Sequence, residues 1–437
     1  MVLPSRRDLA VRALLARHPL TDDQPLAALL DLQGVRDAAN DLHAAFDEVT
    51  APGRPVLHTF AVKAGSLVPV LRLLDGFGIG CEVASPGELA LARAAGLAAD
   101  RIVLDSPAKT PAELAEALAL GIALNADNPQ ELARLDALVG AGREPAGPVG
   151  LRVNPQLGGG TIDAMSTATA TSKFGVALGD PGARDWVVRA CTDRPWLTRL
   201  HCHVGSQGMA LERMAAGVRA TYELAEEINA AAGRRQIDTL DIGGGLPVNF
   251  GSDEVTPTFR DYARLLRRTV PGLFDGRYGL VTEFGRSLLA KSGFILARVE
   301  YTKSAGGRPI AVTHAGAQVA VRTVFVPESW PIRVAAYHAD GLPKRDGPQV
   351  RQDVAGPCCF AGDLVARDRP LPRLVPGDLV ALLDTGAYYF SNPFGYNALP
   401  RPGVYGYSAD GEGPAVLTTL RRPQTVEELV AEYGGDC

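Results

Sequence analysis

A single lysine follows an apolar segment at a place where a charged side chain is costly to bury. Residues 56–62 have the composition of a buried strand, Lys63 comes next, and residues 67–74 have a helical pattern. Desolvation lowers the pKa of an ammonium group, and a neutral amine is a nucleophile that can form a Schiff base. The structural alternative is a lysine that reaches sideways to a surface carboxylate. Considered alone, Lys63 favours that structural alternative. Other residues further along the chain favour the chemical interpretation instead.

Three further groups of residues with chemical potential each follow an apolar segment. His203 precedes Ser206, three glycines occupy positions 243–245, and Glu283 precedes Arg286. A run of glycines lets backbone N–H groups converge on a phosphate without interference from side chains. Each group alone also has a simpler interpretation: a buried structural histidine, a chain reversal, and a carboxylate that pairs with a lysine. Only a scaffold that brings them together would favour a shared chemistry.

Strand and helix patterns alternate regularly after about residue 55. Most strand candidates are short continuous apolar runs, as expected when both faces of a sheet are covered. Eight such strands with intervening helices predict an α/β fold, a (β/α)8 TIM barrel, with a doubly wound open sheet as the alternative. The predicted strands are 56–62, 79–83, 102–104, 123–125, 150–153, 200–204, 239–242 and 280–283, and the predicted helices include 86–95, 111–120, 129–139 and 211–232.

The pattern changes near residue 290, where strand-like segments follow one another without comparable helices between them. We therefore expect an N-terminal segment at 1–40 that joins a β domain, a barrel at 41–290, and a C-terminal all-β domain at 291–437. The strands predicted for this last part are 294–301, 309–313, 319–326 and 379–383.

In a barrel of this kind, catalytic groups lie at the carboxyl ends of the strands, and phosphate sites often follow strands 7 and 8. Lys63, His203, the glycines at 243–245 and Glu283 all fall at such positions. A reactive lysine, an anion-binding loop and a carboxylate together predict pyridoxal phosphate, which needs a Schiff-base lysine, an anion site and an acidic partner for its pyridine nitrogen. A metal site is not expected, because the His, Cys and acidic residues show no ligand spacing.

The composition excludes several other classes of protein. The 437-residue chain has a net charge of −5, with both signs intermixed, which argues against binding to nucleic acid or to an anionic membrane. No apolar run approaches the ~18 residues needed to cross a bilayer, and the N-terminal segment is interpreted as a helix and not as a signal peptide. Six cysteines, two of them adjacent, form no disulfide framework. A reduced, cytoplasmic protein is expected.

From about residue 25 to 425, the chain resembles the fold-type III pyridoxal-phosphate enzymes, specifically the diaminopimelate/ornithine decarboxylase family. Gly65 replaces the asparagine usual after the family's lysine motif, and Phe284 replaces a proline. The resemblance implies an alanine racemase-like barrel with a C-terminal β domain, pyridoxal 5'-phosphate as cofactor, and amino-acid decarboxylation. The segments that carry it are 60–64, 203–207, 241–245, 283–286, 356–363, 384–388 and 396–402.

The resemblance also implies roles for individual residues. Lys63 is expected to hold the cofactor, His203 to pack on its ring, and Cys359 to reprotonate the substrate α-carbon, while Cys358 is interpreted as a small buried hydrophobe. A homodimer is implied, with Cys359 and Tyr388 reaching active sites at the subunit interface. Lys173 and Asp363 match positions that pair across that interface. The expected cofactor-binding residues are Lys63, His203, Ser206, Gly243, Gly244, Gly245, Glu283, Gly285, Arg286 and Tyr388.

The chain departs from the family's pattern where the distal end of diaminopimelate would bind. Arg286 and Arg322 keep the cations that recognise the distal carboxylate, whereas Val326 and Phe360 replace a tyrosine and a glutamate. An unpaired ammonium beside these apolar groups would cost several kcal/mol. We therefore expect Arg286, Arg322, Val326, Phe360 and Tyr388 to bind a small amino-acid substrate that has a distal acidic group and no distal ammonium.

Specialised-metabolite decarboxylases that act on carrier-bound or citryl-conjugated amino acids are plausible relatives. Three alternatives remain open: a meso-diaminopimelate decarboxylase of lysine biosynthesis, an amino-acid racemase with the same cofactor, and a homologue that binds partners without catalysis. Retention of Lys63, Glu283 and Cys359 argues against the last of these.

Overall fold

The computed structural model describes the whole chain except residues 1–4, 19, 54–55, 346, 410–412 and 436–437. The chain forms two compact units. The barrel unit comprises Ala38–Val248 and Val255–Leu288, and the β unit comprises Met1–Asp37, Asn249–Glu254 and Leu289–Cys437.

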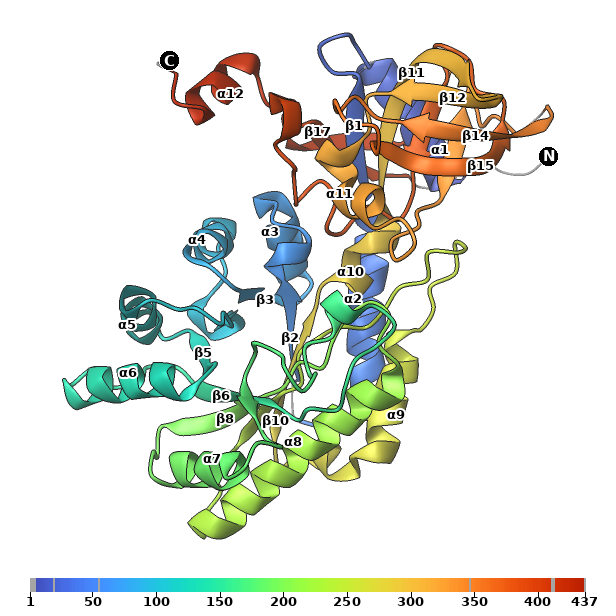
Figure 1. The fold of residues 1–437 in the computed structure, drawn as a ribbon. Coiled ribbons are helices and arrows are strands. Elements are labelled where there is room, and N and C mark those ends of the chain that lie inside the picture. Colours follow the sequence, from blue (N-terminus) through green and yellow to red (C-terminus); the bar gives the residue numbers. More distant parts are fainter. Residues whose placement is uncertain (1–4, 19, 54–55, 346, 410–412, 436–437) are drawn as a thin grey trace. The chain divides into compact units, whose positions relative to one another are not determined.

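Eight parallel strands form a closed ring in the described part of the barrel unit (Figure 1). Each strand pairs with the next, and β10 pairs with β2 to close the ring. The predicted (β/α)8 barrel is therefore confirmed. Its strands in ring order are β2 (Val56–Ala61), β3 (Gly80–Val83), β4 (Ile102–Leu104), β5 (Ala123–Ala126), β6 (Val149–Asn154), β8 (Leu197–His201), β9 (Thr239–Asp241) and β10 (Gly279–Phe284), and the two-residue β7 (Val176–Ala177) lies beside β6.

Side-chain caps and glycines fix the ends of the barrel helices. Ser85, Thr110 and Asn128 each accept a hydrogen bond from the backbone three residues later, at the start of a helix. Predicted ranges 86–95, 111–120 and 211–232 match α4 (Pro86–Ala95), α5 (Pro111–Leu120) and α8 (Leu211–Ala232). The remaining helices of this part are α2 (Leu32–Asp47), α3 (Val68–Gly76), α6 (Pro129–Gly140), α7 (Ala183–Thr192), α9 (Phe259–Thr269) and α10 (Arg286–Leu289).

Two site residues lie just beyond the strands to which the sequence assigned them. Lys63 lies in a short 3-10 turn, Val62–Ala64, that follows β2. The sixth predicted strand, 200–204, lies three residues earlier as β8, which ends at His201 opposite Asp241. The apolar residues after His201 extended the predicted strand, but His203 belongs to the loop that follows.

The β unit is built on a nine-stranded sheet, whose main order is β15, β14, β12, β11, β1, β17 and β18. The N-terminal strand β1 lies between β11 and β17, and residues of helix α1 pack in the core of this sheet. The elements are α1 (Arg6–Arg17), β1 (Leu26–Asp31), β11 (Gly293–Ala305), β12 (Arg308–Thr313), β13 (Val334–Tyr337), β14 (Gln349–Ala355), β15 (Leu364–Pro372), β16 (Leu379–Leu382), β17 (Gly403–Ser408), β18 (Val416–Arg421) and α12 (Val426–Glu432).

One strand predicted for the β unit is wrong. Residues 319–326, rich in β-branched side chains, form most of helix α11 (Ala317–Phe325), which carries a kink at Ala320. The buried positions Val319, Ala320, Thr323 and Val324 recur at helical spacing, whereas Phe325 is exposed. Burial of one helical face therefore outweighs the strand propensity of the segment.

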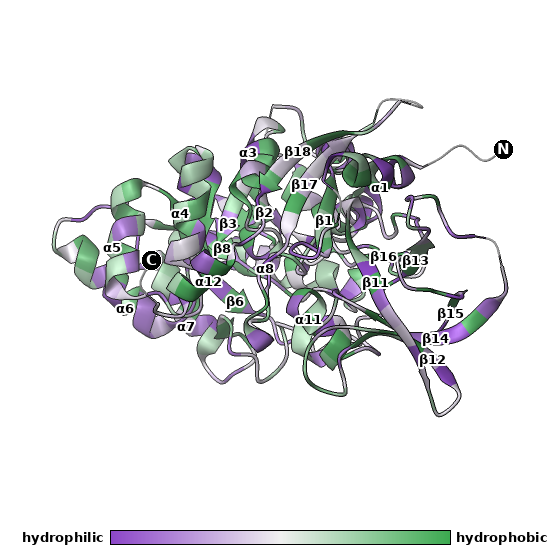
Figure 2. Cartoon of the chain, turned by 90° about the horizontal axis from the view of Figure 1, so that it is seen from above, coloured by the Kyte–Doolittle hydropathy of each residue, from purple (hydrophilic) through white to green (hydrophobic). Residues whose placement is uncertain are grey.

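Two adjacent residues of strand β10 have opposite surroundings, one polar and one apolar. Glu283 contacts His201 inside the barrel, whereas the ring of Phe284 is fully buried against Phe259, with ring centroids 5.1 Å apart. Phe46 and Tyr262 complete this aromatic cluster. The substitution of phenylalanine for the family's usual proline therefore fills a packed site between the barrel and its helices. Figure 2 shows hydrophobic and hydrophilic residues intermixed on helices around the barrel, as expected when one helical face is covered.

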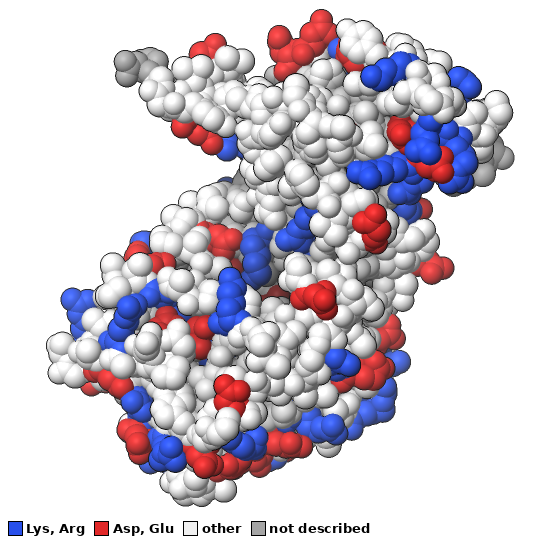
Figure 3. Space-filling view, viewed as in Figure 1, with Lys and Arg blue, Asp and Glu red and all other residues white. Residues whose placement is uncertain are grey.

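Charged side chains of both signs are interspersed over the visible face of the molecule (Figure 3). Among the helices of the described residues, none has the length and apolar character that a membrane span requires.

We predict that Phe284→Ala destabilises the barrel unit by about 3–5 kcal/mol, because it leaves a cavity in the aromatic cluster. The matched control is Phe325→Ala, since that ring is 54% exposed, and a change within about 1 kcal/mol is expected there. Urea unfolding followed by fluorescence measures both. Equal destabilisation by the two variants would contradict the packing described for Phe284.

Candidate active site

Lys63 lies at the carboxyl end of β2 and pairs with a buried carboxylate. Its Nζ is 2.5 Å from Oε2 of Glu82 on β3, and the Glu82 side chain is 1% exposed while that of Lys63 is 49% exposed. Burial raises the pKa of Glu82, and the Lys63 ammonium acts against this rise. The lysine therefore neither lies buried alone nor reaches a surface carboxylate. Sequence reasoning missed Glu82, although a lone acid in the apolar run 79–83 was the available signal.

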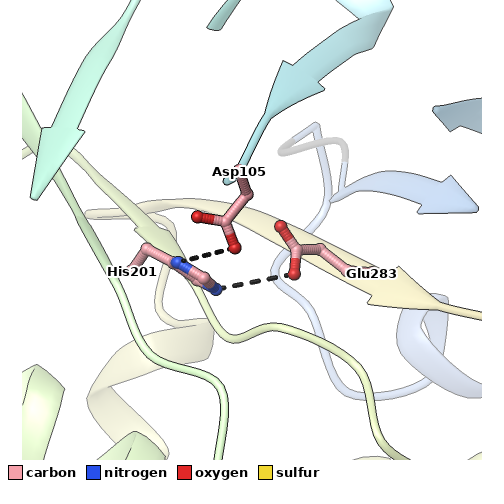
Figure 4. A group of neighbouring side chains, drawn as sticks. All are labelled: Asp105, His201 and Glu283. Atoms are coloured by element: carbon pink, nitrogen blue, oxygen red, sulfur yellow. Dashed lines mark ion pairs between the residues drawn. The ribbon is translucent and has the colours of Figure 1, made fainter. Parts of the chain in front are cut away.

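His201 lies between two carboxylates inside the barrel (Figure 4). Its Nδ1 is 3.3 Å from Oδ2 of Asp105, and its Nε2 is 3.5 Å from Oε2 of Glu283. Burial by itself would lower the pKa of His201, but the two carboxylates raise it well above its usual value. Burial, and then repulsion from Asp241, raises the pKa of Glu283 to about 8, although His201 opposes both.

Sequence reasoning selected His203 and overlooked His201. The spacing of two residues could have revealed it, because alternate residues of a strand share a face. Since β8 ends at His201, only that histidine projects from the strand into the barrel.

Asp105, His201 and Glu283 are also close enough together to surround a cation, with their ligand atoms within 4.8 Å of one another. They come from three different strands, so their spacing in the sequence could not show this group. Nη1 of Arg152 lies 3.2 Å from the same Asp105 oxygen that contacts His201. Because a guanidinium stays protonated in proteins, it repels a metal ion there, while Asp105 and Glu283 are the groups that favour a protonated His201.

The glycines at 243–245 pack tightly against neighbouring backbone. A Cβ on Gly244 would lie 2.0 Å from the carbonyl oxygen of Glu283, and one on Gly245, whose φ is +95°, would lie 1.8 Å from that of Gly205. The N–H of Gly244 donates to Nδ1 of His203 at 3.1 Å. Burial, and then the charge of Arg152, lowers the pKa of His203 well below its usual value. His203 is therefore a neutral ring whose Nδ1 accepts this hydrogen bond.

The other predicted residues of the barrel unit follow the same strand ends. Gly285 lies against the turn that carries Lys63, since a Cβ there would be 3.0 Å from the Cβ of Ala64. Arg286 begins α10 and is 3% exposed. Ser206 lies in the loop after β8, and its backbone N–H donates to the carbonyl of Met165.

Cys359 lies on an exposed loop of the β unit that several hydrogen bonds hold in place. Its backbone N–H donates to Oδ1 of Asn397 at 2.8 Å, and its carbonyl accepts from the Tyr396 hydroxyl at 3.3 Å. Asp363 fixes the preceding residue by accepting from the N–H of Cys358 at 2.7 Å. Burial, and then Asp363, raises the pKa of Cys358 to about 11. Cys358 is therefore buried and inert, whereas the adjacent Cys359 is exposed.

Arg322 of the β unit has aromatic neighbours and no acidic partner. Its guanidinium carbon lies 4.7 Å from the ring centroid of Tyr388 and 5.0 Å from that of Trp330. No carboxylate among the described residues forms an ion pair with it, and its Nη1 is buried without a hydrogen-bond partner. Tyr388 has a φ of +66°, a conformation that is rare for a residue with a bulky side chain.

Val326 and Phe360 belong to an exposed apolar surface of the β unit. Val326 is 46% exposed, and Phe360 stacks on Phe325 with ring centroids 5.4 Å apart. Phe394 and Tyr396 complete a cluster of four aromatic rings. No charged group takes part in these ring contacts.

The residues of the barrel unit fit the cofactor that the sequence predicts. Lys63 supplies an amine beside a carboxylate, the glycine loop leaves no room for side chains, and His203 presents an uncharged ring. Glu283 supplies a buried carboxylate whose Oε1 has no hydrogen-bond partner. This donor set suits a phosphate, an aromatic ring and a protonated ring nitrogen.

Comparisons with known proteins agree with this donor set. The family model described as pyridoxal-dependent decarboxylase, pyridoxal binding domain, matches residues 34–290. A diaminopimelate decarboxylase of Pseudomonas aeruginosa is 34% identical over 381 residues, covering 87% of this chain and 86% of the relative.

Solved structures resemble the whole chain. The diaminopimelate decarboxylase of M. jannaschii in complex with L-lysine has a TM-score of 0.83 and 25% identity, and the match covers 97% of this chain and 94% of that one. A lysine/ornithine decarboxylase from Vibrio vulnificus, complexed with putrescine, has a TM-score of 0.75 at 22% identity, over 94% of this chain and 100% of that one. This second likeness concerns the fold alone.

We predict that Gly244→Ala weakens pyridoxal phosphate binding at least about tenfold, or about 1.4 kcal/mol, because the added Cβ meets backbone and displaces the loop. Gly140→Ala in α6 is the matched control, since a Cβ there meets nothing within 4 Å. Titration of each apoprotein with the cofactor, followed by absorbance, measures the affinity. Unchanged affinity in Gly244→Ala would contradict the assignment of this loop.

Proposed function

We propose a substrate class for this chain, which belongs to the family of pyridoxal-dependent decarboxylases. The protein is a pyridoxal-phosphate-dependent amino-acid decarboxylase. We propose that its substrate carries a distal carboxylate or another acidic group and lacks a distal ammonium. The guanidinium of Arg322, which has aromatic neighbours and no carboxylate partner among the described residues, supports the distal acidic group. The observation that carries the absence of a distal ammonium is the apolar surface of Phe360 and Val326.

A guanidinium in this setting is a receptor for an anion. Arginine presents paired N–H donors that match a carboxylate, and partial burial strengthens the resulting charge-assisted hydrogen bonds. The rings of Trp330 and Tyr388 lie at cation–π distance from the guanidinium. An acidic group on the substrate would supply the negative charge that pairs with the Arg322 guanidinium.

The surroundings of Phe360 and Val326 disfavour a distal ammonium. Phe360 packs in an aromatic cluster with Phe325 and Tyr396. The side chain of Val326 has no hydrogen-bond acceptor. An ammonium desolvated against these groups would lose its hydration without gaining a partner, which costs several kcal/mol. Apolar or conjugated extensions of the substrate are better matched to this surface.

Pyridoxal phosphate supplies an electron sink for the electron pair left on the α-carbon when the carboxylate departs as carbon dioxide. Lys63 holds the cofactor, and the pairing of its amine with Glu82 keeps a proton acceptor within 2.5 Å. His203 packs as a neutral ring, so it leaves the charge of the site unchanged. Glu283 would hold a proton for the ring nitrogen. The N–H groups of Gly243 and Gly244 donate to Asp241 and His203, so the glycine loop would contribute to the phosphate site through its lack of side chains.

Cys359 is the proton donor that we assign to the α-carbon. Departure of carbon dioxide leaves that carbon one proton short, and a thiol can donate this proton. The Cys359 N–H donates to Asn397 and the Tyr396 hydroxyl donates to the Cys359 carbonyl, and these bonds hold the loop while the side chain stays exposed for this task. We propose a homodimer in which Cys359 and Tyr388 serve the active site of the partner subunit.

Decarboxylation of meso-diaminopimelate is the second candidate function. The names of the relatives favour it, since the Pseudomonas aeruginosa protein is a diaminopimelate decarboxylase that matches 87% of this chain. The same two arginines, Arg286 and Arg322, would bind the distal carboxylate in both cases. The candidates therefore differ at the distal ammonium alone.

We predict that the holoenzyme releases carbon dioxide from an acidic amino acid without a distal ammonium at least about tenfold more efficiently than from meso-diaminopimelate, since tenfold corresponds to only about 1.4 kcal/mol. The measurement is kcat/KM for carbon dioxide release over a panel of dicarboxylic and conjugated amino acids, with Lys63→Ala as the blank. Chiral analysis of recovered substrate separates decarboxylation from racemisation. Equal or better turnover of meso-diaminopimelate would sink the proposed specificity.

The double variant Phe360→Glu with Val326→Tyr tests the same idea by gain of function, because it supplies an acceptor and a charge for the ammonium. Phe394→Glu is the matched control, since it adds a carboxylate to the same aromatic cluster at a position outside the family's recognition set. Only the double variant is expected to shift preference toward meso-diaminopimelate.

A further inference from the structure

We propose that His201 is a positioning residue, an imidazolium that holds the buried carboxylate of Glu283 in place and limits its affinity for protons. This inference rests on the proposed role of Glu283 as partner of the cofactor's ring nitrogen. It adds a residue that acts through Glu283 and does not touch the cofactor or substrate itself.

Each nitrogen of His201 lies within ion-pair distance of an acid. Nδ1 lies 3.3 Å from Asp105 and Nε2 lies 3.5 Å from Glu283, from opposite edges of the ring. The side chain is 0% exposed, so water does not compete for either nitrogen. Neither contact has hydrogen-bond geometry, but an acidic group close to each side of a ring stabilises the charged form of that ring electrostatically. The arrangement therefore favours an imidazolium (Figure 4).

The other charged groups of the barrel interior are matched elsewhere. Arg152 pairs with Asp105 at 3.2 Å, and Lys63 pairs with Glu82 at 2.5 Å. Asp241, which faces Glu283 from β9, accepts hydrogen bonds from the N–H of Gly243 and the amide of Asn125. Among the ion pairs of the described residues, His201 is the one cation that lies against Glu283.

The energetics of burial give this pairing its importance. Desolvation and the charge of Asp241 both raise the pKa of Glu283, to about 8, and His201 is the group that opposes them most directly. An opposite charge within about 4–6 Å typically lowers a carboxyl pKa by about 1–3 units. Without His201, Glu283 would hold its proton more tightly and would lose the contact that fixes its orientation.

A metal ion is the competing occupant for this group of ligands. It would have to displace the proton from one His201 nitrogen while Arg152 remains 3.2 Å from the shared Asp105 oxygen. The metal ion would then replace the imidazolium as the positive charge beside the carboxylates. A bound metal and an imidazolium therefore predict different amounts of metal in the purified protein.

The test compares His201→Gln with His58→Gln in the apoprotein. His58 is an equally buried barrel histidine, but burial lowers its pKa to about 3 and it contacts the Thr282 hydroxyl at 2.8 Å, so it is a neutral control. Infrared difference spectra across pH follow the carboxyl band that is lost in Glu283→Gln. We expect a midpoint near pH 8 in the wild type, a midpoint raised by about 1–3 units in His201→Gln, and no shift in His58→Gln.

An unshifted midpoint in His201→Gln would overturn the proposal. So would stoichiometric metal that is present in the wild type and absent from His201→Gln. If His201→Gln does not fold, nitrogen NMR of histidine-labelled wild type decides the matter, because a neutral His201 at pH 7 contradicts the proposal and a doubly protonated ring supports it.

Cofactor affinity separates this proposal from the function on which it rests. If Glu283→Gln binds pyridoxal phosphate and decarboxylates normally, the assigned role of Glu283 fails, and with it the functional meaning of the His201 contact. If Glu283→Gln is impaired and His201→Gln lowers cofactor affinity by about tenfold or more, as expected for one unit of pKa, the positioning role is supported. Rescue of that affinity by His201→Lys, and not by His201→Asn, would confirm that charge is the decisive property.

Discussion

Buried negative charge inside the barrel is the constraint on which this structure depends. An unpaired charge left in a protein interior costs several kcal/mol, so each buried carboxylate needs a cation or several donors. Lys63, Arg152 and His201 supply the cations, and backbone N–H groups supply further donors. These acids lie on neighbouring strands of the ring or directly after them, and Glu283 on β10 contacts His201. The buried carboxylates of the barrel unit include those of Glu82, Asp105, Asp241 and Glu283.

The barrel unit and the β unit divide the chemistry between them. Residues that fit the cofactor, including Lys63 and Glu283, follow strands of the barrel. Residues that we assign to the substrate's distal end and to proton donation, including Arg322 and Cys359, lie on α11 and loops of the β unit. Phe360 belongs to the β unit, so its replacement leaves the charged residues of the barrel unit unchanged.

Much of the fold could be predicted from the sequence, because local signals and the final packing agree in the barrel. Continuous apolar runs predicted its strands, and helical patterns predicted helices such as α5. The segment at 319–326 could not be predicted, since its β-branched residues favour a strand and only packing against the sheet selects a helix. Within the site, residues in motifs could be predicted, whereas Glu82 and His201 were missed. Glu82 acts through a contact with Lys63, which follows the preceding strand, and His201 through contacts with Asp105 and Glu283 from strands distant in the sequence.

The central claim is that charge pairing in the barrel leaves Lys63 as the amine that holds pyridoxal phosphate. The most direct measurement is borohydride reduction of the holoenzyme, which fixes the cofactor covalently to its lysine, followed by mass mapping of the peptides. The account predicts a single pyridoxyl group on Lys63 and none in Lys63→Ala. A pyridoxyl group on another lysine, such as the buried Lys109 that pairs with Glu131, would contradict it.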